Sequence, residues 1–364
     1  MPEDVPEEDR RIFSLAVSTC VRSVTVSLDL VLNQQYSVEN SDIFEQFSEL
    51  ACQAGAVQVL TSLFNEHERV ALLERLAALV RIPNLKSLEM ILGTWASLLR
   101  ANGAVIPSSL KKFQVKNKIE KDAISLKMLP NGAVAALLDY CMVWLRNGGG
   151  LASGMDPKNA SLQAERDQWE ECFETFEEMK TQWVVVRAKI MEVVKLCSNL
   201  EPEIAAEKLL DNINGAFSWL QSLEESSTSD EARACILEGV QSYTECVMLV
   251  LPIENIGAHD TVIEIEKLIM MTMGMMHGLQ SLAQHAKILE SFSRIGIVRP
   301  NLVPLIIKHL FEMLNAIATD DVGAHPARGK ARGLKLSQIV RQKICSAMLN
   351  ICTTIPEVRV DTYT

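Results

Sequence analysis

Apolar residues recur every three or four positions along most of this chain, and short polar or glycine-containing stretches separate the periodic segments. The first segment, Asp9 to Leu32, has this spacing and predicts a helix, while its Val21 to Val31 portion also alternates in the manner of a strand. Ser41-Asp42 can cap a second helix, predicted from Ile43 to about Gln53, and Gly55 follows where we expect the chain to turn. Helices are therefore the predicted units of the fold.

Later segments repeat the pattern, and capping or helix-breaking residues mark their ends. Pro83-Asn84 precedes a predicted helix from Leu85 to Arg100. The segment from Leu162 to Leu196 is longer than an ordinary repeat helix, so it is either a hairpin or a helix that breaks near Gln182. The strongest interruption, Asn147 to Ser161, predicts a flexible loop or hinge. The other predicted helices are Ala133–Arg146, Glu203–Leu223, Asp230–Leu251 and Thr261–Ile295.

One stretch, Ser48 to Ile82, resembles an armadillo repeat. The turn of that family corresponds here to Ala54-Gly55, and two amphipathic segments follow it. Each segment is too short to bury its own apolar stripe, so it must stack on neighbours. The apolar places of the repeat are filled by Val57, Leu60, Leu63 and Phe64, and then by Val70, Leu73, Leu76, Ala77 and Val80.

The end of the chain resembles HEAT repeats, in Arg294 to Asp320 and again in Leu336 to Glu357. A proline-containing turn precedes a helix in the first, and Val340-Arg341 resembles the Val-Arg opening of HEAT helices in the second. This tail is also similar to the helical-repeat region of symplekin, a scaffold of mRNA 3′-end processing. The apolar places are filled by Leu302, Leu305, Ile306, Leu310, Met313 and Leu314, and then by Ile344, Met348 and Ile351.

These resemblances imply an all-α fold, an irregular right-handed α-solenoid of armadillo/HEAT-like helical repeats. We expect four regions along the chain. They are armadillo-like repeats at 1–146, the flexible loop at 147–161, long acidic helices at 162–260 and HEAT-like repeats at 261–364.

Composition argues against a membrane or secreted protein. The longest apolar run, Leu268 to Met276, is about half of what a membrane-spanning helix needs, and the acidic start is unlike a secretory signal. The nine cysteines are scattered through apolar helical patterns, which predicts buried, reduced thiols in the cytoplasm or the nucleus.

Charge divides the chain and suggests where partners bind. Residues 162–260 carry 7 basic and 20 acidic side chains, a net charge of −13, whereas residues 261–364 carry 12 and 8, a net charge of +4. An acidic surface attracts basic or amphipathic helical segments of protein partners. The candidate acidic residues are Glu170, Glu171, Glu174, Glu177 and Glu178.

A second candidate is the basic stretch around Gly323 to Ala331. It has the outline of a phosphate-binding loop, but five residues rather than four separate Gly323 from Gly329, and Ala331 stands where Ser or Thr would hold magnesium. A solvated basic loop that touches acidic partners fits better. Its few charges and lack of aromatic residues argue against nucleic acid as a partner. The candidate basic residues are Arg328, Lys330, Arg332, Lys335 and Arg341.

No catalytic, cofactor or metal site is predicted. His277 and His285 fall near one helix face beside several methionines, which favours core packing over a soft-metal site because further ligands at helical spacing are missing. We therefore expect a non-catalytic scaffold or adaptor that binds a partner protein segment on its helical surface. The alternative is a helical-repeat factor in nuclear transport or RNA 3′-end processing. The sequence leaves the oligomeric state open.

Overall fold

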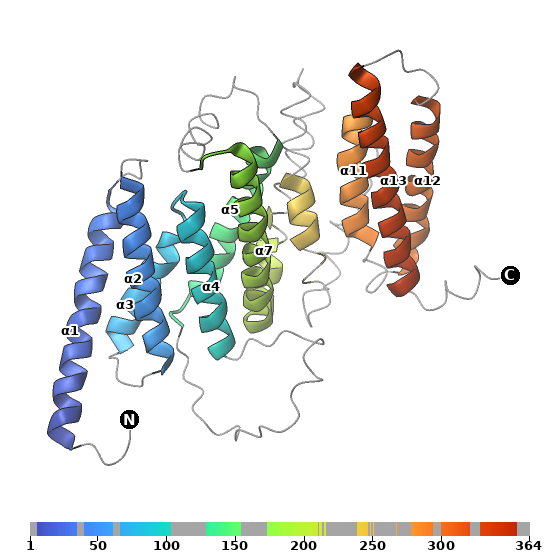
Figure 1. Ribbon diagram of the computed structural model, residues 1–364. Helices are drawn as coiled ribbons and strands as arrows, with labels where there is room; N and C mark the ends of the chain where they lie inside the picture. The colour runs from blue at the N-terminus through green and yellow to red at the C-terminus, as the bar shows by residue number, and fades with distance from the viewer. Residues whose placement is uncertain are drawn as a thin grey trace. The chain divides into compact units, whose positions relative to one another are not determined.

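The fold is all-helical in a computed structural model of the chain, with no strand among the residues that the structure describes (Figure 1). This confirms the predicted fold class. The chain divides into two compact units, residues 1–143 with 160–204 and residues 144–159 with 205–364. The structure describes residues 6–34, 40–60, 66–102, 129–153, 173–209, 211–212, 215, 239–246, 248, 250, 267, 278–293, 300–320 and 328–354.

Four helices open the first unit: α1 (Glu7–Leu32), α2 (Ser41–Leu60), α3 (Glu66–Leu79) and α4 (Leu85–Ala101). Successive helices lie side by side, as short connections require, and α1 also contacts α3 while α2 contacts α4 (Figure 1). Each helix therefore packs both on its chain neighbour and on the next-but-one helix. This is the arrangement of two stacked helix pairs.

The predicted turn at Ala54-Gly55 is wrong, because α2 continues through it to Leu60. Gly55 instead lies where α2 meets its two neighbours. A Cβ atom at this position would stand 3.3 Å from Leu76 Cδ2 on α3 and 3.5 Å from Thr94 Cγ2 on α4. The glycine allows close helix packing, a role that sequence alone does not separate from a turn.

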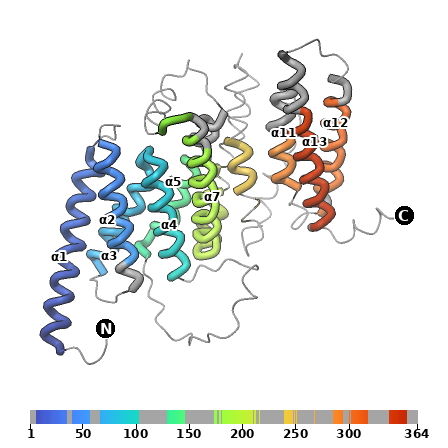
Figure 2. Tube along the Cα trace, viewed as in Figure 1, coloured from blue at the N-terminus to red at the C-terminus, as the bar shows by residue number. Residues whose placement is uncertain are grey.

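A further long helix of this unit, α7 (Phe176–Leu200), contacts α4 (Figure 2). Its N-cap is Thr175, whose Oγ1 accepts a hydrogen bond from the backbone N–H of Glu178 at 3.2 Å. The helix begins after Thr175 and continues through Gln182. The predicted break near Gln182 is therefore wrong. The predicted residues 162–172 lie outside the described part.

The helix α5 (Ala133–Ser153) also differs from its prediction. It starts after Gly132, whose φ of 79° is easy only for glycine. It then runs through the three glycines at 148–150 to Ser153, although glycine has a low intrinsic helix propensity. The predicted loop at 147–161 is therefore wrong up to Ser153, and residues 154–161 lie outside the described part.

In the second unit the structure describes α11 (Gly278–Phe292), a 3-10 turn η3 (Pro300–Leu302), α12 (Val303–Asp320) and α13 (Arg328–Thr354). The three α-helices pack on one another. The turn at Pro300 and the helix after it match the HEAT-like expectation. Along α12 the buried side chains recur at helical spacing, at Val303, Ile306, Leu310, Met313 and Ile317.

One expectation about membranes needs correction. By length and composition α1 is the one helix, within the described residues, that could cross a membrane. The search for an uninterrupted apolar run missed it because Arg22 and Asp29 interrupt the run. Length and composition do not separate a membrane span from a packed helix, and α1 packs on α2 and α3 through Val21, Leu28 and Val31.

Candidate functional site

The predicted acidic surface is only partly within the described residues. Glu170 and Glu171 lie outside them, and the side chain of Glu177 is likewise not described. Glu174 and Glu178 are exposed at the start of α7. Glu178 accepts a hydrogen bond from the backbone N–H of Glu174 at 3.1 Å, and its own N–H is held by Thr175.

This pair of bonds is a close variant of a capping box, in which a residue at the third helical position reaches back to the start of the helix. Glu178 is therefore a structural cap as well as a surface charge. The Thr-x-x-Glu pattern of Thr175 to Glu178 stands in the sequence and would have located this helix start. The use of these glutamates in partner binding stays a prediction.

The predicted basic loop is wrong from Arg328 onward, because α13 begins there. The helical register divides the candidates: positions 328, 332 and 335 fall on one side of α13, and positions 330 and 341 fall roughly opposite. Within this helix Arg341 is exposed. A nearby lysine, Lys343, is engaged inside the unit, where its Nζ lies 2.7 Å from Glu290 Oε2 of α11.

The predicted histidine and methionine cluster is described only at His285, which is fully buried on α11 and so lies in the core as expected. His277 and the methionines before it lie outside the described residues. In the part of the chain that the structure describes, no group of three or more His, Cys, Asp or Glu residues is placed to hold a metal ion.

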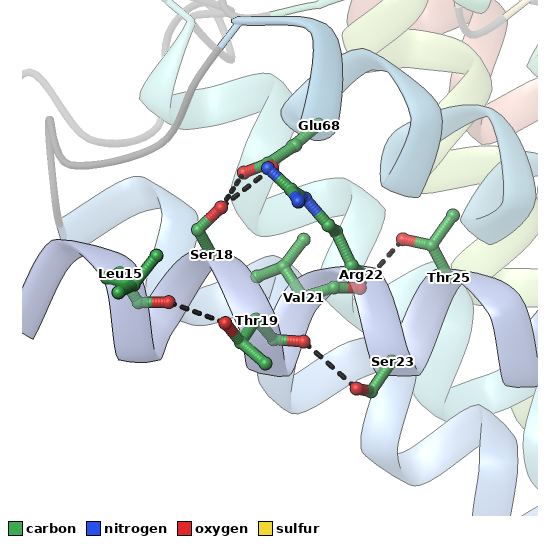
Figure 3. Close-up of polar contacts among 8 residues, drawn as sticks. All are labelled: Leu15, Ser18, Thr19, Val21, Arg22, Ser23, Thr25 and Glu68. Atoms are coloured by element: carbon green, nitrogen blue, oxygen red, sulfur yellow. Dashed lines mark hydrogen bonds and ion pairs between the residues drawn. The ribbon is translucent and has the colours of Figure 1, made fainter.

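A buried carboxylate ties α1 to α3. Glu68 of α3 is 7% exposed, and its two oxygens accept hydrogen bonds from Ser18 Oγ at 2.7 Å and from Arg22 Nε at 2.5 Å (Figure 3). Burial by itself would raise the pKa of Glu68, but the bonds from Ser18 and Arg22 outweigh it and hold the pKa below its usual value. Glu68 is therefore an ionised, fully engaged group and not a proton donor.

A second ion pair joins the same two helices one heptad further along. Arg75 of α3 donates from Nε and Nη2 to the two oxygens of Asp29 on α1, at 2.9 and 3.2 Å. Arg22 precedes Asp29 by seven residues, as Glu68 precedes Arg75. The two helices therefore run parallel. In the first pair α1 supplies the arginine, and in the second pair α1 supplies the aspartate. A slip of one helix by a heptad would set Arg22 against Arg75.

The same design joins α4 to α7. Gln182 Nε2 donates to Glu89 Oε2 at 2.6 Å, and about three turns further on Arg100 pairs with Glu192. Burial would raise the pKa of Glu192, but hydrogen bonds from Lys189 and Arg100 outweigh it and lower the pKa. Because both contacts advance in the same direction along the two helices, α4 and α7 are also parallel.

These contacts define rigid stacking and not chemistry. Among the described residues, the two carboxylates with lowered pKa, Glu68 and Glu192, form ion pairs between helices, whereas general acid catalysis needs a carboxyl that can give up a proton near neutral pH. What the arrangement can do is to hold successive helices in register and present their outer surfaces to another macromolecule.

One such surface was missed by the sequence reading. The side of α1 that faces away from α3 carries Ile12, Leu15, Val26 and Leu30, which are 61%, 68%, 59% and 64% exposed. Thr19 and Ser23 lie between them, on the side away from Glu68 (Figure 3). The signal was in the sequence, since apolar residues occupy both sides of this helix, and only one side can face α2 and α3.

Helices that are stacked in pairs and held in parallel register define, in the part of the chain that the structure describes, a helical-repeat protein. Comparison with known proteins gives the family: the pattern of the Exportin-5 family matches residues 73–363, and the chain belongs to that family. Its members are HEAT-repeat α-solenoid receptors of the importin-β-like karyopherin class. A search of curated proteins gave no match.

Family membership decides several expectations. Transport receptors of this family are non-catalytic, and they shuttle between the nucleus and the cytoplasm, which confirms the predictions on both points. The alternative function, a helical-repeat factor in nuclear transport, fits the family better than a general scaffold does. The match to the Exportin-5 family also replaces the resemblance to symplekin. That resemblance rested on a proline turn and a Val-Arg helix opening, which are too common to identify a family.

Proposed function

We propose that this chain acts as the cargo-binding helical array of a nuclear export receptor. The observation that carries the proposal is the family match over residues 73–363, which includes part of α3 and the described helices that follow it in both units. Exportins bind cargo together with the GTP form of Ran. A receptor of this kind needs a long surface with a fixed helix register, which the ion pairs between α1 and α3 and between α4 and α7 support.

Transport through nuclei of permeabilised cells tests this directly. The chain, fused to a fluorescent protein and loaded into nuclei, is expected to leave faster with a Ran-type GTPase in the GTP form than with a GDP-locked variant. An inert fusion of the same size is the control for passive exit. An exit rate equal to that control under both conditions would rule out the proposal.

The cargo contact we propose is the acidic stretch before and at the start of α7, with a protein segment that is basic or amphipathic as its cargo. The net charge of −13 over residues 162–260 supports this choice, because such a surface concentrates cationic partners. Charge reversal at Glu170, Glu171, Glu174 and Glu177 is expected to abolish the capture of basic protein cargo from nuclear extract. Glu178 stays unchanged because it caps α7.

A matched variant reverses four exposed glutamates outside residues 162–260: Glu7 and Glu8 on α1, Glu45 on α2 and Glu66 on α3. The change of net charge is the same, so cargo capture by the matched variant is expected to persist. Equal loss in both variants would show that only total charge matters and would contradict the proposed contact.

Exportins also carry RNA cargo. The basic positions of α13 allow RNA to be tested as an alternative to protein cargo. Anisotropy with a structured RNA at 50 and 200 mM salt is expected to show only weak, salt-sensitive binding, because the side of α13 at positions 328, 332 and 335 holds few charges. Tight binding at 200 mM salt that is lost in the Arg328→Ala, Arg332→Ala, Lys335→Ala variant would establish RNA as the cargo instead.

A further inference from the structure

We propose that the outer face of α7 docks one amphipathic helix of a protein partner, packed antiparallel to α7 with its basic C-terminal end over the acidic start of α7. The inference rests on the cargo contact proposed above and names the kind of segment that this acidic stretch takes. Described helices precede and follow α7, so its exposure does not come from an end of the chain. We define the outer face as the exposed residues Glu174, Glu178, Thr181, Val184, Val185 and Ala188.

The two valines of this face are exposed although the opposite side of α7 is buried. Val184 is 65% exposed and Val185 is 39% exposed. On the opposite side Trp183, Val186 and Ile190 are at most 4% exposed, and α4 contacts α7 on its flank (Figure 1). The helix therefore carries a second apolar patch that the packing of its own unit does not cover. A contiguous apolar patch with a polar rim is typical of an interaction surface.

Helical register arranges this patch as a hole for one side chain of a second helix. The patch occupies positions i, i+3, i+4 and i+7, the four positions that form a hole in knobs-into-holes packing. Val184 and Val185 stand at the sides of the hole, and the smaller residues Thr181 and Ala188 stand at its two ends along the helix. We therefore expect the partner to place a leucine-sized aliphatic side chain here.

The next hole towards the start of α7 is acidic. It is formed by positions 174, 177, 178 and 181, one heptad before the apolar hole. Among the described residues the carboxylate of Glu174 has no ion-pair partner, and the carboxylate of Glu178 accepts one hydrogen bond, from the backbone N–H of Glu174 at 3.1 Å. A carboxylate has room for further hydrogen bonds beyond one. The negative charge is therefore available to a Lys or Arg side chain of the partner.

The charges at the two ends of α7 determine the direction of the partner helix. Lys195 follows Thr181 by two heptads, so it falls on the same side of α7, and it has no ion-pair partner among the described residues. The side that holds the outer face is thus negative at its N-terminal end and positive at its C-terminal end. Helices are stabilised by acidic residues in their first turn and basic residues in their last turn. A helix of that kind matches both ends of α7 only when it runs antiparallel.

The two holes define a pattern for the partner segment. In the antiparallel orientation, the residue one heptad after the leucine knob lies over the acidic hole. The pattern is therefore a leucine followed one heptad later by Lys or Arg, with acidic residues in the first turn. A helix that reaches from the acidic hole to Lys195 needs about 20 residues, because each residue adds about 1.5 Å. One helix on one face forms a small interface, so we expect micromolar and not nanomolar affinity.

Fluorescence anisotropy with a synthetic peptide measures this docking on the full chain. The probe is a labelled helix of about 20 residues, with Glu in its first turn, a stripe of Leu centred on one Leu, and Arg in its last two turns. Val184→Ser with Val185→Ser is expected to weaken binding about tenfold or more with an unchanged circular dichroism spectrum. The matched control is Val26→Ser with Leu30→Ser, two exposed aliphatic residues of α1, which should bind the peptide as the wild type does.

Several results would overturn the proposal. They are a wild type that does not bind the peptide, equal binding of a scrambled peptide of the same composition, and equal weakening by both double variants. A dimer in light scattering that Val184→Ser with Val185→Ser dissociates would also overturn it, because a second copy would then occupy the face. The assay contains no GTPase and no transport step. Loss of export with retained peptide binding would therefore contradict the proposed function alone, and the reverse result would contradict the docking alone.

Disulfide cross-linking tests the orientation of the bound helix. In a background in which the exposed Cys20 and Cys345 are replaced by Ser, Thr181→Cys and Ala188→Cys chains are oxidised separately with a peptide that carries Cys just after its central Leu. The antiparallel orientation places this peptide residue nearer to position 181, so the Thr181→Cys chain should cross-link in higher yield. Peptide mass spectrometry identifies the products. A higher yield with the Ala188→Cys chain would indicate a parallel partner and contradict the proposal.

Discussion

Arg75 on α3 binds both carboxylate oxygens of Asp29 on α1, with Nε and Nη2 at 2.9 and 3.2 Å. The contact spans 46 residues of sequence, and the pair of Arg22 with Glu68 spans the same distance in the opposite polarity. Two pairs one heptad apart fix the helices both in direction and in register. Such a contact between next-but-one helices is what turns a series of hairpins into a stacked array.

The contribution of this bidentate pair can be isolated by a double-mutant cycle. Asp29→Ala and Arg75→Ala are each expected to lower the free energy of unfolding. Because Asp29 is about half exposed, the coupling between them should be about 0.5 to 1 kcal/mol. Urea unfolding followed by circular dichroism measures it. Arg75 with Glu74, its exposed neighbour, is the control pair and should show weaker coupling.

Acid sensitivity should depend on Glu68. Its pKa is lowered in the folded chain, so the stabilisation is present above the pKa of the unfolded chain, near 4.5, and is lost as the pH falls through the folded pKa. Glu68→Gln is expected to cost about 1 to 2 kcal/mol at pH 7 and to flatten the decrease in stability below pH 4.5. An unchanged acid profile would show that the pairing with Ser18 and Arg22 does not hold in solution.

Two glycines give different expectations for a larger residue. Gly93 on α4 has nothing within 4 Å of a built Cβ, so Gly93→Ala should stabilise the chain by about 0.5 to 1 kcal/mol through helix propensity. At Gly55 the contact with Leu76 offsets that gain, and Gly55→Leu should cost about 2 to 3 kcal/mol. Thermal unfolding of Gly93→Ala, Gly55→Ala and Gly55→Leu is the measurement. If Leu is tolerated at position 55 without loss of stability, the close contact with α3 is contradicted and the turn predicted at Ala54-Gly55 is favoured instead.

Thiol reactivity should separate the cysteines by burial. Cys20 and Cys345 are exposed, contrary to the predicted burial, and should react with iodoacetamide within minutes at pH 8. Burial raises the pKa of the Cys52 thiol to about 11, so Cys52 should stay unmodified until the chain unfolds. This raised pKa also means that its contribution to stability is lost between about pH 9 and pH 11. Peptide mass spectrometry assigns the labelled positions.

The sequence predicted the helices whose ends carry chemical signals. Asn84, for example, accepts a hydrogen bond from the Ser87 backbone at 2.9 Å, and α4 starts where the Pro83-Asn84 pair placed it. Glycine misled at Gly55, where it serves a close helix contact rather than a turn, and at positions 148–150, where α5 continues. The distinction depends on what lies opposite, which spacing along one chain does not contain.

The interaction surfaces likewise depend on which segments pack opposite one another. The charges of Glu174 and Arg341 and the Thr-x-x-Glu capping pattern that ends at Glu178 could be read from the sequence, but the helical start of α13 at Arg328 could not. Nor could the outer face of α1 be separated from its inner face before the packing of α3 was known. Partner surfaces are defined by what the fold leaves uncovered, and that is decided by contacts between distant segments.

The affinity of the purified chain for a Ran-type GTPase, measured by titration calorimetry with the GTPase in its GTP and GDP forms, tests the central claim most directly. An export receptor of the Exportin-5 family is expected to bind the GTP form at least tenfold more tightly when basic protein cargo is present. Equal affinity for the two forms, or no binding to either with cargo present, would contradict the proposed transport function.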